Sequence, residues 1–117
     1  MARYSYSLQY AESEIDQVDD KGVAAPNDIL AAFDAFDWRA QVRAADKLQK
    51  CSPTFSVREA DGERLFWVSA YGEPDLKFVN DYSEGSSGRE LSITEARLAV
   101  QLFVEGDHDG LRKLLKG

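Results

Sequence analysis

The feature that most constrains the fold is the stretch from Thr54 to Tyr82, in which apolar and polar residues alternate around two turn signals. The pair Asp61-Gly62 is typical of a two-residue hairpin turn, because both positions tolerate positive φ. The second signal, Gly72–Asp75, contains glycine and proline and indicates a four-residue turn. The stretch therefore predicts three antiparallel strands.

These turns also predict a strand register, which sorts the side chains onto two faces. Pairing Arg58 with Leu65, and Tyr71 with Leu76, places an aliphatic set on one face: Phe55, Val57, Phe66, Val68, Ala70 and Val79. The other face collects a largely aromatic set, Leu65, Trp67, Tyr71, Leu76, Phe78 and Tyr82, interleaved with Thr54, Ser56, Arg58, Ser69 and Asn80. A slip of one residue would swap the faces of the strand that slips.

The aromatic face is the candidate functional surface. A sheet with one packed and one wet face is not expected to carry so much apolar area outward. This face is therefore either covered by another part of the chain or meets a partner. The candidate protein-binding residues on it are Arg58, Leu65, Trp67, Tyr71, Phe78 and Tyr82.

The N-terminal half supplies one further strand and helical segments. Residues 3–10 alternate, with three tyrosines and a leucine on one side, which indicates a half-buried strand. Residues 11–25 are polar and acidic without a strong period, so we expect a loop there. The segment from Pro26 to Lys50 fits either one bent helix or two short helices, with basic residues on the outer face.

The C-terminal part begins with a glycine-rich connector, residues 83–90, and continues as helix. Ser92 and Glu95 have the spacing of a capping box, Gly106 can end that helix in a left-handed conformation, and Asp107 can cap a last short helix. The order strand, helix, three strands, helix, helix predicts one α+β domain over residues 1–117. In it, an antiparallel sheet of about four strands packs against helices on one face.

Composition and charge restrict the possible partners. The net charge of −7 makes nucleic acid a poor partner, and no apolar run approaches the roughly 20 residues of a membrane span. The first residues lack a signal-peptide pattern, and Cys51 is the only cysteine, which favours a cytoplasmic location. Residues 1–37 carry a net charge of −6 and residues 38–58 a net charge of +4. Solvated faces explain this layout, and so does an acidic surface that attracts a basic partner.

No catalytic, metal or cofactor motif is present, so we expect neither a cofactor nor a metal. The sole histidine, His108, excludes a multi-histidine site, and its place at a helix start predicts a surface position. Cys51 follows a helix end, where the helix dipole disfavours a thiolate nucleophile. Carboxylates are plentiful, which leaves open an acid–base pair in a pocket.

In size, acidity and element order, the chain resembles the small bacterial immunity proteins that neutralise toxin domains. Residues 52–82 followed by residues 92–106 carry the resemblance. It implies a non-catalytic cytoplasmic module that binds a protein partner. Small acidic secretion chaperones are similar in composition but usually open with a helix. Two alternatives stay open: a homodimer that buries the aromatic face, and a small enzyme with a carboxylate-lined pocket.

Overall fold

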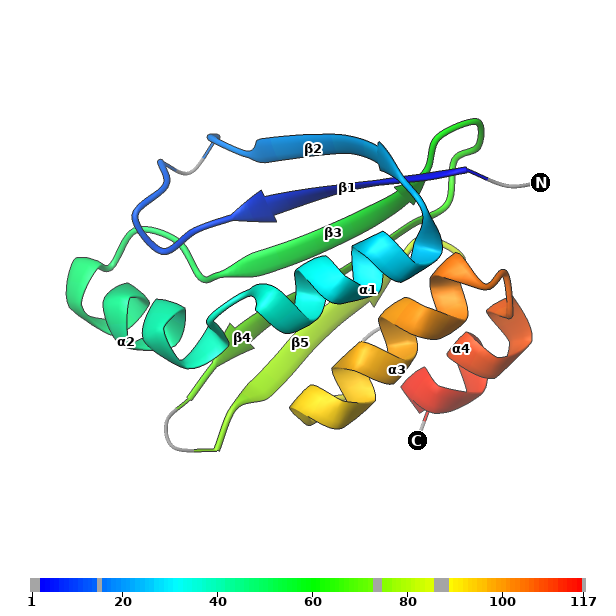
Figure 1. Ribbon diagram of the computed structural model, residues 1–117. Helices are drawn as coiled ribbons and strands as arrows, with labels where there is room; N and C mark the ends of the chain where they lie inside the picture. The colour runs from blue at the N-terminus through cyan, green and yellow to red at the C-terminus, as the bar shows by residue number, and fades with distance from the viewer. Residues whose placement is uncertain (1–2, 15, 73–74, 86–88, 117) are drawn as a thin grey trace.

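The computed structural model describes residues 3–14, 16–72, 75–85 and 89–116. Its elements follow the order β1 (Tyr4–Gln9), β2 (Asp19–Ala24), α1 (Pro26–Ala35), α2 (Trp38–Leu48), β3 (Thr54–Glu59), β4 (Leu65–Tyr71), β5 (Lys77–Tyr82), α3 (Ile93–Val104) and α4 (His108–Lys116). The strands form one antiparallel sheet in the order β2-β1-β3-β4-β5. Helices α1 and α3 cross one face, α4 lies beside α3, and α2 continues from the end of α1 (Figure 1). The predicted α+β class is confirmed.

The core lies between the sheet and the helices. Strand β4 alternates between buried and more exposed residues, and the buried ones, Phe66, Val68 and Ala70, lie on the helix-covered face of the sheet. Full burial of a side chain the size of valine or phenylalanine contributes roughly 1.5–3 kcal/mol through the removal of apolar surface from water. Other large side chains of this core include Tyr4, Leu8, Ile29, Phe33, Trp38, Phe55, Val57, Phe78, Tyr82, Val100, Phe103 and Leu111.

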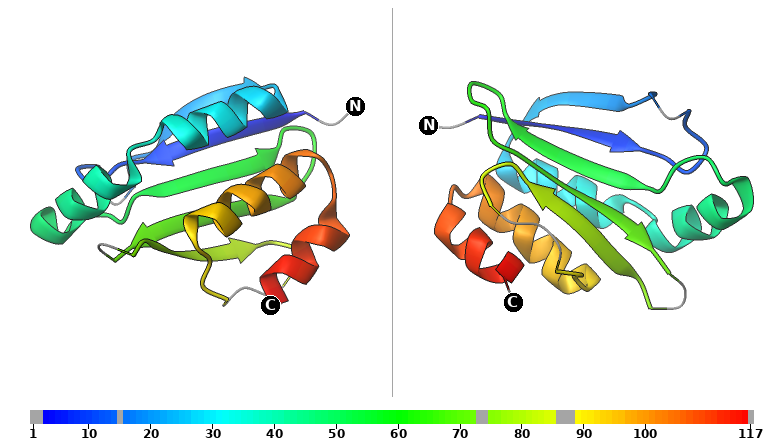
Figure 2. Two further views of the ribbon diagram at one scale, coloured as in Figure 1. Left: turned by 60° about the horizontal axis from the view of Figure 1, so that its bottom comes forward. Right: turned by 180° about the vertical axis from the view of Figure 1, so that it is seen from behind.

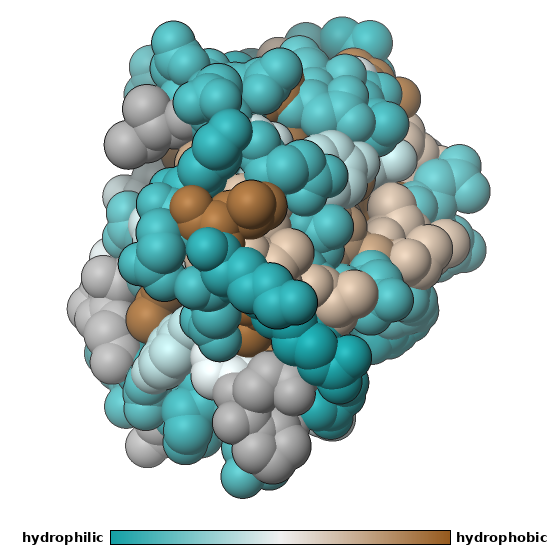
Figure 3. Space-filling model, turned by 90° about the vertical axis from the view of Figure 1, so that its left-hand side faces the viewer, coloured by the Kyte–Doolittle hydropathy of each residue, from teal (hydrophilic) through white to brown (hydrophobic). Residues whose placement is uncertain are grey.

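Two helices, not one bent helix, occupy the segment from Pro26 to Lys50. Pro26 starts α1, where its missing N–H needs no acceptor. The chain becomes extended at Phe36, and the Asp37 carboxylate then caps α2 by accepting from the Ala40 N–H at 3.2 Å. The outer surface of α2 carries exposed Arg39, Arg43 and Lys47 as predicted, and this end of the molecule is mostly hydrophilic (Figure 3).

The predicted caps at the C-terminal helices are confirmed. Ser92 accepts from the Glu95 N–H at 3.2 Å, and the Glu95 carboxylate accepts from the Ser92 N–H at 3.0 Å. Gly106 has φ +78°, which ends α3 in the left-handed region. The Asp107 carboxylate accepts from the Gly110 N–H at 2.9 Å at the start of α4.

A fifth strand, β2, lies where a loop was expected, and that expectation was wrong. Its sequence, Asp-Asp-Lys-Gly-Val-Ala, has low intrinsic strand propensity, so pairing with β1 makes it a strand. The pairing shifts register between Tyr6 and Ser7, opposite Gly22, which has φ +76°. Charged residues and such a bulge protect an edge strand from adding further strands.

The predicted register is right for one hairpin and wrong for the other. Arg58 pairs with Leu65 across β3 and β4 as predicted. Across β4 and β5, however, Tyr71 pairs with Lys77, one residue later than predicted. The connection takes the extra residue because Leu76 turns inward, where it is buried near Phe33. The predicted turn Gly72–Asp75 includes residues 73 and 74, which lie outside the described residues.

Among the described residues, no helix is long and apolar enough to cross a membrane.

Candidate functional site: the helix-free face of the sheet

One face of the sheet carries no helix within the described part of the chain. Seen from behind, the strands face the viewer and the helices lie on the far side (right panel of Figure 2). Alternation along each strand decides which side chains lie on this open face. From β1 to β5 they are Ser5, Ser7 and Gln9; Thr54, Ser56 and Arg58; Leu65, Trp67, Ser69 and Tyr71; and Lys77, Val79 and Asp81.

Four of the six candidate binding residues lie on this open face. Leu65 and Trp67 are half-buried, and Tyr71 is 40% exposed at the end of β4. Arg58 is exposed and makes no ion pair with another described residue. These four side chains lie on neighbouring strands, because Arg58 pairs with Leu65.

The other two candidates, Phe78 and Tyr82, were assigned to the wrong face. The one-residue shift of β5 turns both inward, where they are 0% and 1% exposed. The Phe78 ring packs against Trp38 with the ring centres 5.0 Å apart, and the Tyr82 ring packs against Phe103 at 6.0 Å. Neither residue can contact a partner at the open face.

The same shift brings residues to the open face that the sequence reasoning missed. Val79 is 42% exposed beside Ser69, and Asp81 is directly opposite Trp67. On β2, Val23 lies opposite Ser5 and is 55% exposed. Alternation along β5 could have identified Val79 and Asp81 once the register was known. Val23 could not have been identified, because the pairing of β2 depends on tertiary contacts.

A shallow hollow of about 400 Å³ lies on the open face over β1 and β3. Three small hydroxyl-bearing residues, Ser5, Ser7 and Ser56, line it. Its other lining residues include Val18, Asp20, Arg58 and Leu65. The hollow thus combines small hydroxyl-bearing residues with apolar residues and charges of both signs.

An acidic loop borders the open face on the β2 side. Residues 12–20 contain five carboxylates, four of which are exposed: Glu12, Glu14, Asp16 and Asp20, with Asp19 half-exposed. The loop is anchored, because the Gln9 amide donates to the carbonyls of Glu14 and Gln17, and Lys50 pairs with Glu14 at 2.8 Å. The hydrogen bond from Lys21 holds the pKa of Asp19 below its ordinary value. The loop therefore presents a cluster of carboxylates beside the sheet.

A second hollow, of about 540 Å³, lies on the helix side between α1, α2 and α3. It contains two carboxylates, and each already has a structural partner. Asp34 accepts two bonds from Arg97, at 2.8 and 3.1 Å, and Asp37 caps α2. Asp34 thus links α1 to α3 and Asp37 caps α2, so the hollow gives little support to acid–base catalysis.

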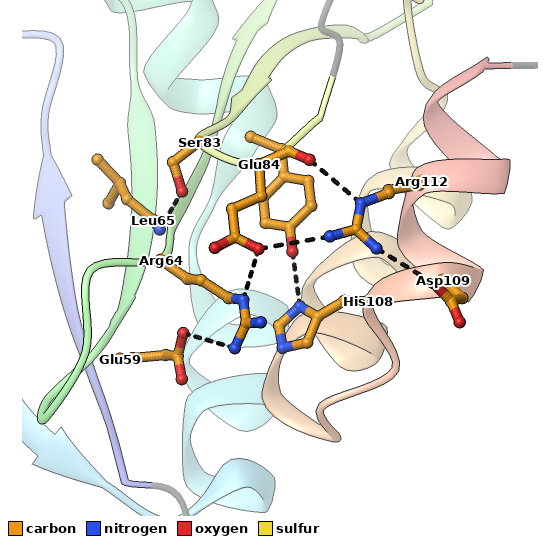
Figure 4. A network of polar contacts seen from close by, with 9 residues as sticks. Glu59, Arg64, Leu65, Ser83, Glu84, His108, Asp109 and Arg112 are labelled. Carbon is orange, nitrogen blue, oxygen red and sulfur yellow. Dashed lines mark hydrogen bonds and ion pairs between the residues drawn. The ribbon is translucent and has the colours of Figure 1, made fainter.

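A polar network at one end of the sheet connects α4 to β5 and to the β3–β4 hairpin (Figure 4). The Tyr82 hydroxyl and His108 Nδ1 are 2.7 Å apart. Glu84 pairs with Arg64 at 2.8 Å and with Arg112 at 3.4 Å. His108, expected at the surface, is half-buried there, and its ring lies parallel to that of Tyr82, with the centres 6.0 Å apart.

The electrostatics of this network favour neutral forms at its centre. Burial raises the pKa of Tyr82, and burial together with the Arg64 charge lowers the pKa of His108. The hydrogen bond from Arg64 lowers the pKa of Glu84, so that carboxylate stays charged between two arginines. The network therefore fixes α4 to the sheet.

Among the described residues, no set of three His, Cys, Asp or Glu side chains is placed to hold a metal ion. The fold and the open face define a class: an α+β domain whose antiparallel sheet has one helix-covered face and one free face. Comparison with protein-family models, curated proteins and solved structures finds no match to this chain. The resemblance to immunity proteins accordingly stays a proposal.

Proposed function

We propose that this protein is a non-catalytic cytoplasmic module of the inhibitor or immunity type, which binds a basic partner protein through the open face of its sheet. The observation that carries the proposal is the placement of Trp67, Leu65 and Val79 on a sheet face with no helix over it. An apolar centre within a polar rim is the usual anatomy of a protein–protein interface.

The rim of the open face has a mixed charge pattern. Arg58 and Lys77 lie toward opposite ends of the face, while Asp20 and Asp81 lie on its two edge strands. Such a pattern can fix the orientation of a partner, because a misplaced partner would put like charges together. Binding energy would come mainly from the apolar centre, with Trp67 as the anchor, since tryptophan is enriched among interface hot spots.

Charge favours a different protein over a second copy of this chain. Each copy carries a net charge of −7, so two copies repel one another at long range. The acidic loop beside the open face instead attracts a basic partner and speeds its association. Lysines or arginines around an apolar patch are therefore the expected surface of the partner.

Docking on the face is also favoured over strand addition at the sheet edges. On β2, the register shift at Gly22 interrupts the line of backbone groups that an added strand would use. On β5, the backbone of Phe78 already exchanges two hydrogen bonds with Leu91, at 2.8 and 3.0 Å. Both edges are thus partly protected.

A matched pair of photo-crosslinking positions tests the proposal. Val79 on the open face and Leu98 on α3 are 42% and 43% exposed, so a photoreactive residue at either position is equally accessible to solvent. We expect irradiation in the native host to capture one heterologous protein from position 79 and not from position 98. The captured protein, once purified, should form a stoichiometric complex with the wild-type chain in sedimentation.

Other outcomes of this experiment contradict the proposal. Capture of a second copy from position 79 would support the homodimer instead. Equal capture from positions 79 and 98, or no adduct from either, would remove the open face as a specific docking surface.

A further inference from the structure

Between β4 and the edge strand β5, the open face brings an aromatic ring and a carboxylate together. Trp67 on β4 and Asp81 on β5 are direct cross-strand partners, and both side chains point away from the helices. The Cβ atoms of such partners lie about 4.5–5.5 Å apart. Asp81 is exposed, and within the described part of the chain it makes no ion pair or hydrogen bond through its side chain.

A tryptophan beside an unpaired carboxylate attracts one kind of group most strongly. The π face of an indole binds a cation, and a guanidinium can lie flat on that face while it donates two hydrogen bonds to a carboxylate. A lysine ammonium is a compact, strongly hydrated charge and cannot do both in the same geometry. The pair therefore favours arginine over lysine.

We propose that Trp67 and Asp81 form a receptor for an arginine side chain of the partner protein. This inference rests on the proposed function and names the group that the open face recognises. It also agrees with the charge of the whole chain, because a partner attracted by a net charge of −7 presents basic residues.

The neighbouring residues restrict where that arginine can bind. Arg58 and Lys77 occupy other parts of the open face and repel a cation there. On the far side of Trp67, Ser56 and Ser7 continue the same cross-strand row, which ends at Asp20 on β2. A segment that lies across this row meets a carboxylate at each end and hydroxyls between them.

The receptor can be tested on the purified full chain with a defined probe. We suggest titration with the peptide Gly-Arg-Gly-Arg-Gly at low ionic strength, followed by the two indole N–H resonances in NMR spectra. We expect the Trp67 resonance to move and saturate. The Trp38 resonance should stay in place, because Trp38 is buried and its indole donates to the Phe33 carbonyl at 3.3 Å.

Two variants with the same change of net charge separate the receptor from general attraction. Asp81→Asn removes the proposed partner carboxylate, and Asp28→Asn removes an exposed carboxylate on α1, in the helix layer. We expect Asp81→Asn to weaken binding about two- to fivefold, the usual range for an exposed ion pair, and Asp28→Asn to leave it nearly unchanged. The matched lysine peptide should bind more weakly than the arginine peptide.

Equal weakening by Asp81→Asn and Asp28→Asn would overturn the receptor, and equal binding of the two peptides would overturn its preference for arginine. These failures are distinct from failure of the proposed function. If position 79 captures a partner but Asp81→Asn has no specific effect, the docking face stands and the receptor falls. If Asp81→Asn acts as expected but no partner is captured, the receptor stands and the docking face falls.

Discussion

The hydroxyl of Tyr82 and the Nδ1 of His108 share a hydrogen bond of 2.7 Å, which joins the last residue of β5 to the first residue of α4. The two rings are also parallel, and both pack edge-on against Phe103. The contact therefore links the C-terminal helix to the sheet and to α3 in one place.

Removal of the Tyr82 hydroxyl tests this link. Tyr82→Phe keeps the ring but leaves His108 Nδ1 half-buried without its partner, so we expect a loss of about 1–2 kcal/mol in the free energy of unfolding. Tyr71→Phe is the control, because Tyr71 is exposed at the open face. The free energy of unfolding of this variant should change by less than about 0.5 kcal/mol. Urea unfolding followed by circular dichroism measures both. Equal stabilities for the two variants would show that the bond contributes nothing.

The same histidine predicts a pH dependence of stability. Burial lowers the pKa of His108 in the folded chain below its ordinary value of 6.5. Between the lowered pKa and 6.5, the unfolded chain therefore binds a proton that the folded chain does not. The contribution of neutral His108 to the stability of the folded chain is therefore fully present above pH 6.5, and it is lost as the pH falls below 6.5. We expect His108→Gln to show a flatter profile than the wild type over pH 5–7 in urea unfolding. Arginines lower the pKa values of the Asp61 and Glu84 carboxylates. The stability that these two groups contribute is lost only at more acidic pH, below their ordinary pKa values of 3.8 and 4.5. Identical profiles for wild type and variant would contradict this assignment.

The register of β5 has a direct test in two adjacent residues. Phe78→Ala removes a fully buried ring and should cost about 3–5 kcal/mol in the free energy of unfolding. Val79→Ala trims a side chain that is 42% exposed and should cost less than about 1 kcal/mol. The alternative register, with Phe78 outward and Val79 in the core, predicts the opposite order.

Gly22 tests whether β2 is part of the folded sheet in solution. Its φ of +76° is strained for residues with a Cβ, although an added Cβ there would meet no atom within 4 Å. Gly22→Ala should therefore cost about 1–2 kcal/mol through backbone strain alone. Gly22→Asn should cost less, because asparagine adopts this conformation more readily. Thermal unfolding compares the two, and no loss in either would mean that β2 does not hold this conformation.

Local signals explain which parts of the fold could be predicted from the sequence. The Asp61-Gly62 signal predicts the β3–β4 register correctly, although neither residue adopts the positive φ of the expected two-residue turn. Ser92 with Glu95 marks the start of α3, because a cap depends on a few adjacent residues. Strand β2 has no such signal, since its residues favour a loop until β1 pairs with them.

The candidate surface was predicted only in part for the same reason. Arg58, Leu65, Trp67 and Tyr71 depend on the well-defined hairpin and lie on the open face. Phe78 and Tyr82 depend on the second connection, whose length changes by one residue when Leu76 enters the core. Since side-chain direction alternates at each residue, that single difference reverses every side chain of β5.

The most direct test of the open face as a docking surface is the affinity of the Trp67→Ser variant for the protein captured from position 79. Leu98→Ser, on α3, is the matched control, and circular dichroism checks that both variants are folded. We predict that Trp67→Ser weakens the complex at least about tenfold, as expected when a hot-spot tryptophan is truncated, and that Leu98→Ser binds like the wild type. Wild-type affinity in Trp67→Ser would contradict the account.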